Sequence, residues 1–231
     1  MAAFLLVHGA FQGGWIWDET ARHLRGLGHE VHAPTLTGCG YLADGLRQGV
    51  DLHTFIQDVS NYIVMHDLKD VILVAHSFSG MICAGAAKRA PHLMRRLVFA
   101  DAVIPESNTS FADLGGEAFR VMLDNHRTGG WKVRPWPLPA FGVTGEQEQW
   151  FSARLRDFPE AAFTTPFPGE FEPDGLPAAF IGCTGTVNAM IQGMAAKASG
   201  LGWPVLTLDS AHSPMTTHPE ELAALLSGFG G

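Results

Sequence analysis

The sequence predicts an α/β protein with a mostly parallel sheet flanked by helices. In the first 105 residues, short apolar runs alternate with segments of helical periodicity, which is the pattern of right-handed βαβ units. Two of the runs, at residues 71–75 and 97–100, show no polar alternation, as expected of strands buried on both faces. With 231 residues, 46% of them hydrophobic, the chain can form one large domain or two small ones around a sizeable core.

The first half of the chain supplies four expected strands and three expected helices in alternation. The strands are expected at residues 4–7, 29–33, 71–75 and 97–100, and the helices at residues 15–26, 52–66 and 78–89. The second helix carries apolar residues at helical spacing, which predict one buried face: Leu52, Phe55, Ile56, Val59 and Ile63. Strands separated by such helices are expected to pair in parallel.

A segment rich in aromatic residues and proline interrupts this pattern between Pro105 and about Pro177. It has helical pieces near residues 116–127 and 145–157 and no strand alternation. It is longer than an ordinary loop and leaves from a strand end, where α/β sheets bind ligands. We therefore expect residues 106–177 to form a helical cap, or lid, and residues 1–105 and 178–231 to form the core. The alternative is a small helical layer with a core of its own. The core pattern resumes with strands at residues 178–181 and 204–208 and helices at residues 187–199 and 218–226.

Composition excludes several classes of protein. The formal net charge is −8, and no basic run is longer than the pair Arg95-Arg96, so no nucleic-acid partner is expected. No apolar stretch approaches the roughly 18 residues of a membrane span, so no membrane association is expected. The apolar start at residues 1–7 lacks a basic n-region, which indicates a first core strand rather than a signal peptide.

Cysteine and histidine usage indicates a cytoplasmic protein without a metal. Cys39, Cys83 and Cys183 are widely spaced and form no CxxC motif, as is typical of reduced, buried cysteines. The eleven histidines form no HExxH motif, and His29 and His32 lack a nearby third ligand. Neither a metal nor another cofactor is expected.

Residues 71–80 read V-I-L-V-A-H-S-F-S-G, which predicts a strand, a tight turn and a helix. Ser77 at the turn is expected at the carboxyl end of the sheet, as a nucleophile elbow requires. The usual glycines are replaced by Ala75 and Ser79, which are the next smallest residues. Ser79 is a weaker candidate nucleophile, and a serine that only caps the helix is the alternative interpretation.

Two other segments are expected to converge on Ser77. His8-Gly9-Ala10-Phe11 follows the first strand, and the backbone N–H groups of Ala10 and Phe78 are placed to stabilise a developing oxyanion. His212 lies on a loop after the last strand and after the serine in chain order, so it is the expected general base. A surface histidine is the alternative.

Three segments resemble the α/β-hydrolase superfamily: L-L-V-H-G-A-F-Q-G-G-W-I-W, V-A-H-S-F-S-G-M and A-H-S-P-M-T-T-H-P-E-E-L. They are most similar to the branch of the plant methylesterases (salicylate-binding protein type), hydroxynitrile lyases and small bacterial esterases. The resemblance covers nearly the whole chain outside the cap and implies an α/β-hydrolase fold. It also implies that Ser77 is the nucleophile, that His212 is the base, that Ala10 and Phe78 are the oxyanion donors, and that residues 106–177 are the cap.

The chain departs from the branch at the acid. The branch reads C-T-x-D after the cap, whereas this chain reads Cys183-Thr184-Gly185-Thr186. Some hydrolases of this fold take the acid from the end of the strand that follows the nucleophile helix, which here makes Asp101 the candidate. The alternative for Asp101 is a cap at the strand end, and Glu106 and Asp209 are less favoured acids.

The lyases of the branch differ at two further positions. They carry a hydroxyl residue and a lysine where this chain has Gly9 and Ser213, so both positions favour an ester hydrolase. We predict a cofactor-independent serine hydrolase that cleaves a small or medium apolar carboxylic ester through an acyl-enzyme. A ligand-binding receptor, a lyase or isomerase, and a C–C hydrolase on the same scaffold are the alternatives. The natural ester and the oligomeric state stay open, a homodimer being one alternative.

Overall fold

A six-stranded parallel sheet forms the centre of the computed structural model, which describes residues 1–172 and 175–231. The strands are β1 (Ala3–Val7), β2 (Glu30–His32), β3 (Val71–Ser77), β4 (Met94–Ala102), β8 (Ala178–Cys183) and β9 (Val205–Leu208). Their order is β2-β1-β3-β4-β8-β9, and every neighbouring pair is parallel. The chain reverses its direction of travel across the sheet between β1 and β3, and ligands bind at such switch points in open α/β sheets.

The mostly parallel sheet predicted from the sequence is confirmed. Each of the six strands lies at an expected position, and the continuous apolar run at residues 71–75 is fully buried in β3. This burial on both faces explains why the run shows no polar alternation.

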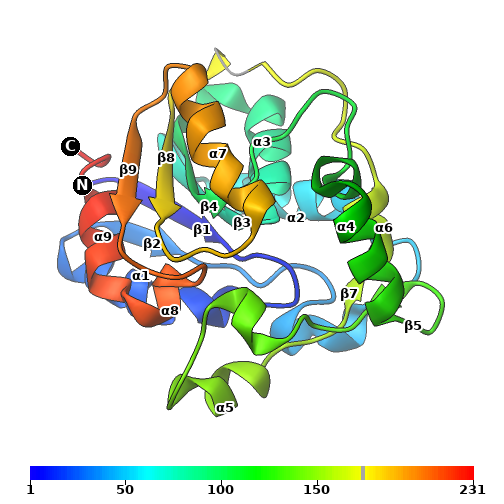
Figure 1. Cartoon of the computed structure of the whole chain (residues 1–231). Coiled ribbons are helices and arrows are strands. Elements are labelled where there is room, and N and C mark those ends of the chain that lie inside the picture. Colours follow the sequence, from blue (N-terminus) through cyan, green and yellow to red (C-terminus); the bar gives the residue numbers. More distant parts are fainter. Residues whose placement is uncertain (173–174) are drawn as a thin grey trace.

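Helices cover both faces of the sheet. On one side, α1 (Asp18–Gly26) packs against α9 (Pro219–Ser227), and on the other α2 (Leu52–Met65) packs against α3 (Ser79–Arg89) and α7 (Ala189–Gly200) lies on β8 (Figure 1). The shorter helical segments are η1 (Gly14–Trp17), η2 (Gly40–Gly45), η3 (Pro91–Leu93), η4 (Leu138–Phe141) and α8 (Pro214–Thr217). The helix expected at residues 15–26 is therefore a 3-10 turn followed by α1.

The segment between β4 and β8 contains both helices and strands. Its helices are α4 (Phe111–His126), α5 (Gln147–Ser152) and α6 (Glu160–Thr164), and β5 (Arg127–Thr128), β6 (Lys132–Val133) and β7 (Phe158–Pro159) form a small antiparallel sheet. The sequence shows no strand alternation in this segment, because strands of two residues are too short to show it. The expected cap at residues 106–177 includes residues 173 and 174, which lie outside the described residues.

Helix α4 begins earlier than the sequence predicts because of a capping box. Ser110 Oγ accepts the Asp113 N–H at 3.1 Å, and the Asp113 carboxylate accepts the Ser110 N–H at 3.0 Å. Gly116 then kinks the helix with a φ of 64°. Because Gly116 interrupts the helical geometry, periodicity alone predicts a helix only from about residue 116.

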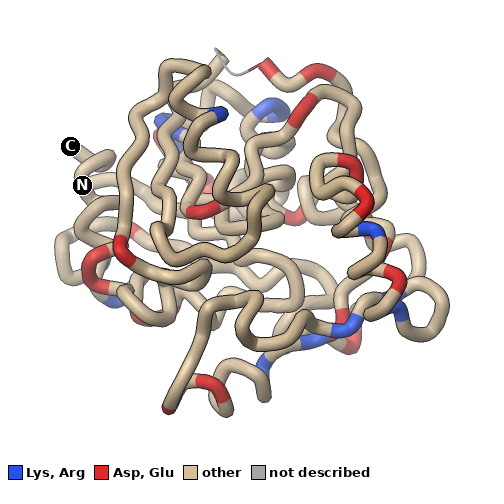
Figure 2. Tube along the Cα trace, in the orientation of Figure 1, with Lys and Arg blue, Asp and Glu red and all other residues tan. Residues whose placement is uncertain are grey.

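The charged residues of the described chain lie mainly on the outer segments, with acidic and basic residues scattered among one another (Figure 2). No helix among the described residues is long and apolar enough to cross a membrane.

Candidate active site

Ser77 stands at the carboxyl end of β3, at the tight turn into α3. Its φ of 56° is in the left-handed region, which is uncommon for a residue with a side chain and marks a sharp turn. The small residue Ser79 is fully buried behind it; its Oγ donates to the Val7 carbonyl at 2.9 Å and accepts the His76 N–H at 2.8 Å. Ser79 therefore ties the turn to β1, and its hydroxyl is fully engaged in this structural role.

Gly80 lets the turn approach the end of β4. A Cβ atom at this position would lie 1.8 Å from the Val103 carbonyl oxygen, so only glycine fits without moving backbone. The Val103 N–H in turn donates to the Ser77 carbonyl at 3.0 Å. Ser77 is thus held by backbone on the side facing β4.

His212 lies on the loop between β9 and α8 and contacts Ser77 directly. Its Nε2 is 3.0 Å from Ser77 Oγ, and the residue is 8% exposed. The loop is also held by β3, because His76 Nε2 donates to the His212 carbonyl at 2.7 Å. Burial lowers the pKa of His76 to about 3, so its ring is neutral and its Nε2 carries the proton.

Asp101 supplies the carboxylate that contacts the other ring nitrogen of His212. It lies at the end of β4 with a φ of 48° and is 2% exposed, and its Oδ2 is 2.6 Å from His212 Nδ1. The same oxygen accepts the hydroxyl of Thr186, and Oδ1 accepts the Cys183 N–H at 3.0 Å. Burial alone raises the pKa of Asp101, but the His212 contact and these two hydrogen bonds outweigh it and lower the pKa below its ordinary value.

The alternative acids are engaged elsewhere. Glu106 forms an ion pair with Lys197 at 2.9 Å, and Asp209 accepts the Thr184 hydroxyl at 2.9 Å. The structure therefore joins Ser77, His212 and Asp101 in one chain of hydrogen bonds, while Thr186, at the position where the branch has its acid, donates to the relocated carboxylate. The sequence showed the substitution at Thr186 but gave no sign of this contact, which depends on how β4 and β8 pair.

The turn after β1 faces the same serine. His8 is buried and neutral: burial lowers its pKa to about 4, its Nδ1 donates to the Gly9 carbonyl at 2.8 Å, and its Nε2 accepts the Leu36 N–H at 3.2 Å. Phe11 completes the turn with a φ of 69°. Within the described chain, the N–H groups of Ala10 and Phe78 have no acceptor, so both are available to a ligand oxygen.

A cavity of about 190 Å³ opens onto Ser77 and His212. Its wall is mostly aromatic and apolar, and much of it comes from the segment between β4 and β8: Phe111, Phe119, Met122, Trp136, Ala140, Phe141 and Phe163. The core contributes Ala10, Gln12, Phe78, Val187, Asn188 and Ile191. The cavity therefore suits a small, uncharged, largely apolar ligand.

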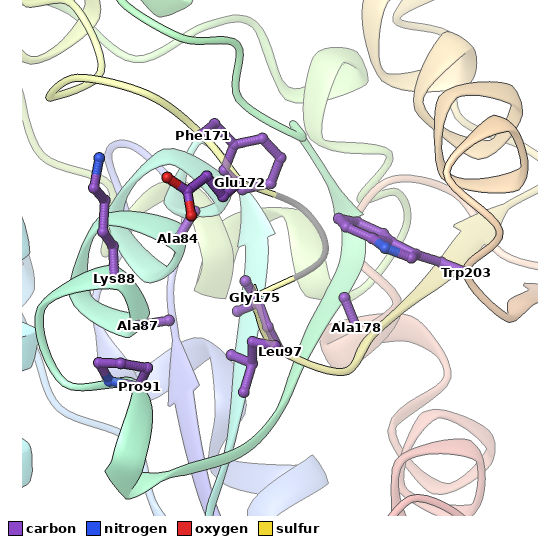
Figure 3. Close-up of a pocket in the computed structure, with 11 residues that line it drawn as sticks. Ala84, Ala87, Lys88, Pro91, Leu97, Phe171, Glu172, Gly175, Ala178 and Trp203 are labelled. Carbon is purple, nitrogen blue, oxygen red and sulfur yellow. The ribbon is translucent and has the colours of Figure 1, made fainter.

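A second cavity of about 310 Å³ lies between α3, Trp203 and Phe171 (Figure 3). Its basic residue, Lys88, donates to the carbonyls of Glu170 at 2.6 Å and Pro168 at 3.3 Å. Among the described residues, no serine, cysteine or histidine lines it, whereas Ser77 and His212 line the smaller cavity. Across the described residues, no three His, Cys, Asp or Glu side chains gather as a metal site would require.

The parallel sheet, the turn at Ser77 and the insertion after β4 define an α/β-hydrolase fold. The model of the alpha/beta hydrolase family matches residues 4–225, and the chain belongs to that family. The resemblance inferred from the three sequence segments is thereby confirmed.

Similarity to individual proteins shows to which branch of the family the chain belongs. A carbendazim hydrolyzing esterase from Nocardioides sp. (strain SG-4G) is 34% identical over the full length of both chains. Salicylic acid-binding protein 2 from Nicotiana tabacum is 36% identical over 47% of this chain and 43% of its own length. Among solved structures, the chain aligns with an extracellular alpha/beta-hydrolase from a Paenibacillus species, with a TM-score of 0.84 and 26% identity over 99% of this chain and 98% of that chain. That hydrolase is described as a structural and functional homologue of the tobacco protein. These relatives confirm the branch that the sequence indicates.

Proposed function

We propose that this protein is a carboxylic ester hydrolase that uses Ser77 as nucleophile, His212 as general base and Asp101 as the orienting acid, without a cofactor. The observation that carries the proposal is the continuous set of contacts from Ser77 Oγ through both ring nitrogens of His212 to Asp101 Oδ2, at 3.0 and 2.6 Å. Contacts of this kind activate a serine hydroxyl.

The reaction proceeds in two halves. His212 Nε2 takes the proton as Ser77 Oγ attacks the ester carbonyl, and the N–H groups of Ala10 and Phe78 stabilise the oxyanion. The alkoxide leaves with the proton from His212, which gives an alcohol and an acyl-Ser77. A water molecule, deprotonated by His212, then attacks the acyl group and releases the carboxylic acid and the serine.

The cavity supports a small apolar substrate. At about 190 Å³ with aromatic walls, it accommodates a neutral ester of few atoms, and the net charge of −8 disfavours polyanions. The relative that hydrolyses carbendazim supports testing methyl carbamates beside methyl esters. We further propose that residues 106–177 act as the cap, since this segment supplies much of the cavity wall, including most of its aromatic side chains.

Ser213 favours hydrolysis over the lyase alternative. It follows His212 where the related lyases carry a lysine, and its Oγ donates to the Phe141 carbonyl at 2.7 Å. This position therefore supplies no cation to hold a cyanide leaving group. The intact contacts of Ser77 and His212 likewise disfavour a receptor without turnover.

We also propose a cytoplasmic location. The three cysteines, Cys39, Cys83 and Cys183, are free and buried, which fits a reducing compartment. Cell fractionation with antibody detection tests it, and recovery from the culture medium contradicts it.

The function is tested with a fluorophosphonate and a series of p-nitrophenyl esters of increasing chain length. We expect one covalent adduct by intact mass and turnover that favours short acyl chains, both abolished in Ser77→Ala. Ser152→Ala, which changes an exposed serine of α5, is the matched control and retains both. Turnover that depends on Ser77 without any adduct would favour a lyase, and the absence of both would favour a receptor.

A further inference from the structure

Gln12 is a buried polar residue in the wall of the cavity. It is 1% exposed, and its Oε1 accepts the Gly9 N–H at 3.1 Å. Only the oxygen of a carboxamide can accept from an N–H group, so this contact fixes the orientation of the side chain. The Nε2 group therefore points away from the Gly9 N–H.

The Nε2 group has no acceptor within the part of the chain that the structure describes. The Nε2 atom also keeps some accessible surface. Trp15 Nε1 and His76 Nδ1, which likewise have no hydrogen-bond partner, are completely enclosed by protein atoms. Since Gln12 is almost completely buried and lines the cavity, the surface left to Nε2 faces the cavity. Besides the backbone N–H groups of Ala10 and Phe78, the cavity thus has a side-chain donor of fixed orientation.

This donor lies beside the nucleophile. A Cβ atom built on Gly9 would lie 3.1 Å from Ser77 Cβ and 3.2 Å from Gln12 Oε1, so the carboxamide and Ser77 border the same small space. A donor from which a ligand displaces water without supplying an acceptor costs about 1–3 kcal/mol. A substrate that brings an acceptor to this point avoids that cost, and an isostere without the acceptor does not.

We propose that Gln12 Nε2 forms a donor subsite that selects esters whose acyl group carries a hydrogen-bond acceptor, a ring nitrogen or an oxygen, close to the carbonyl carbon. The subsite deepens the proposed function and rests on it, because it concerns which ester Ser77 attacks. Gln12 is here a specificity-determining residue, and its Oε1 additionally supports the turn that carries Ala10.

Methyl picolinate and methyl benzoate test the subsite, because they share shape and size and differ in the ring nitrogen next to the ester-bearing carbon. The measured quantity is the ratio of kcat/KM for the two esters in wild type and in Gln12→Met. The comparison of the two ratios cancels the intrinsic reactivity of each ester. We expect the picolinate preference to fall about tenfold in Gln12→Met, and to stay unchanged in Gln149→Met, an exposed residue of α5. An equal loss of kcat/KM for both esters would show that Gln12 acts only by supporting the turn after β1, and no loss would show that it does not act at all. Either result overturns the subsite.

A binding measurement separates this proposal from the proposed function. Calorimetry with Ser77→Ala measures the dissociation constants of both esters without turnover and with Gln12 unchanged. We expect methyl picolinate to bind about tenfold more tightly than methyl benzoate, and equal dissociation constants overturn the subsite. If wild type hydrolyses neither these two esters nor any of the p-nitrophenyl esters, the proposed function fails, while the two dissociation constants still decide whether the donor subsite exists.

Discussion

Asp101 is the residue on which the proposed reaction depends most, because the position used by related enzymes holds Thr186. Its carboxylate lies 2.6 Å from His212 Nδ1 and is almost fully buried. It holds the ring in the tautomer that accepts the serine proton, and it stabilises the imidazolium that forms.

We expect Asp101→Asn to lower kcat by roughly 10⁴-fold, by analogy with other triads. The amide keeps the shape of the side chain but cannot offset the positive ring. Steady-state hydrolysis of a p-nitrophenyl ester measures the loss, with Asp209→Asn as the control, since Asp209 is exposed and contacts Thr184. If the two variants have similar activity, Asp101 is not the acid.

Thr186 acts as a positioning residue for Asp101. It is 2% exposed and donates to the same Oδ2 that His212 contacts. Replacing it with the isosteric valine removes a hydrogen bond to a charged group, worth about 1.5–3 kcal/mol, and we expect kcat to fall at least about tenfold in Thr186→Val.

The pH profile separates this positioning role from a general loss of structure. The Thr186 hydrogen bond contributes to the lowered pKa of Asp101, so its loss raises that pKa. The loss of kcat in acid that protonation of Asp101 causes should then begin at higher pH in Thr186→Val and return to its wild-type position in Thr186→Ser. A lower kcat with an unshifted acid limb in Thr186→Val would contradict the role.

At the scale of elements, the contact of α3 with the end of β4 decides whether the turn at Ser77 can form. Gly80 faces the Val103 carbonyl with no room for a Cβ atom. Both partners are backbone, so no side-chain rotation relieves the overlap.

Gly80→Ala should therefore destabilise the fold by more than about 3 kcal/mol, the upper end of ordinary overpacking. The matched control is Gly193→Ala in α7, where a Cβ atom meets nothing within 4 Å; it should gain up to about 1 kcal/mol from helix propensity. Urea unfolding of both variants measures the difference. Similar midpoints would show that the backbone yields at Gly80 at little cost.

The elements also show how far the sequence predicts the fold. Long apolar runs such as residues 71–75 and amphipathic helices such as α2 were found, because burial dictates their composition. The strands β5, β6 and β7 were missed, since two residues define no period. Asp101 could only be offered as the favoured one of several acids, because the position at which the branch carries its acid holds Thr186 and no motif marks the replacement.

At the scale of the whole molecule, the site is assembled where segments from both ends of the chain meet. The turn after β1, the ends of β3 and β4, and the loop after β9 converge at the carboxyl edge of the sheet. Two buried neutral histidines join these segments: His8 connects the turn to Leu36, and His76 connects β3 to the His212 loop. The stability of the fold is therefore linked to their protonation.

This linkage predicts a loss of stability in mild acid. Burial lowers the pKa of His8 to about 4 and that of His76 to about 3, from 6.5 when unfolded. Between about pH 6.5 and 4 the unfolded chain binds one more proton at each histidine than the folded chain. The free energy of unfolding is therefore fully retained above pH 6.5, and it falls on acidification by about 1.4 kcal/mol per pH unit for each histidine. The lowered pKa of Asp101 acts in the same direction at still lower pH.

Urea unfolding at pH 7.5, 6.0 and 5.0 measures this slope. His76→Asn should reduce it by about 1.4 kcal/mol per pH unit, because one of the two buried rings is gone. His53→Gln, at an exposed position of α2, should leave it unchanged. A free energy of unfolding that is the same at pH 7.5 and 5.0 would contradict the linkage, because the two rings would then accept protons in the folded state. The contacts of His76 with the His212 carbonyl and of His8 with the Leu36 N–H would then not depend on neutral imidazoles.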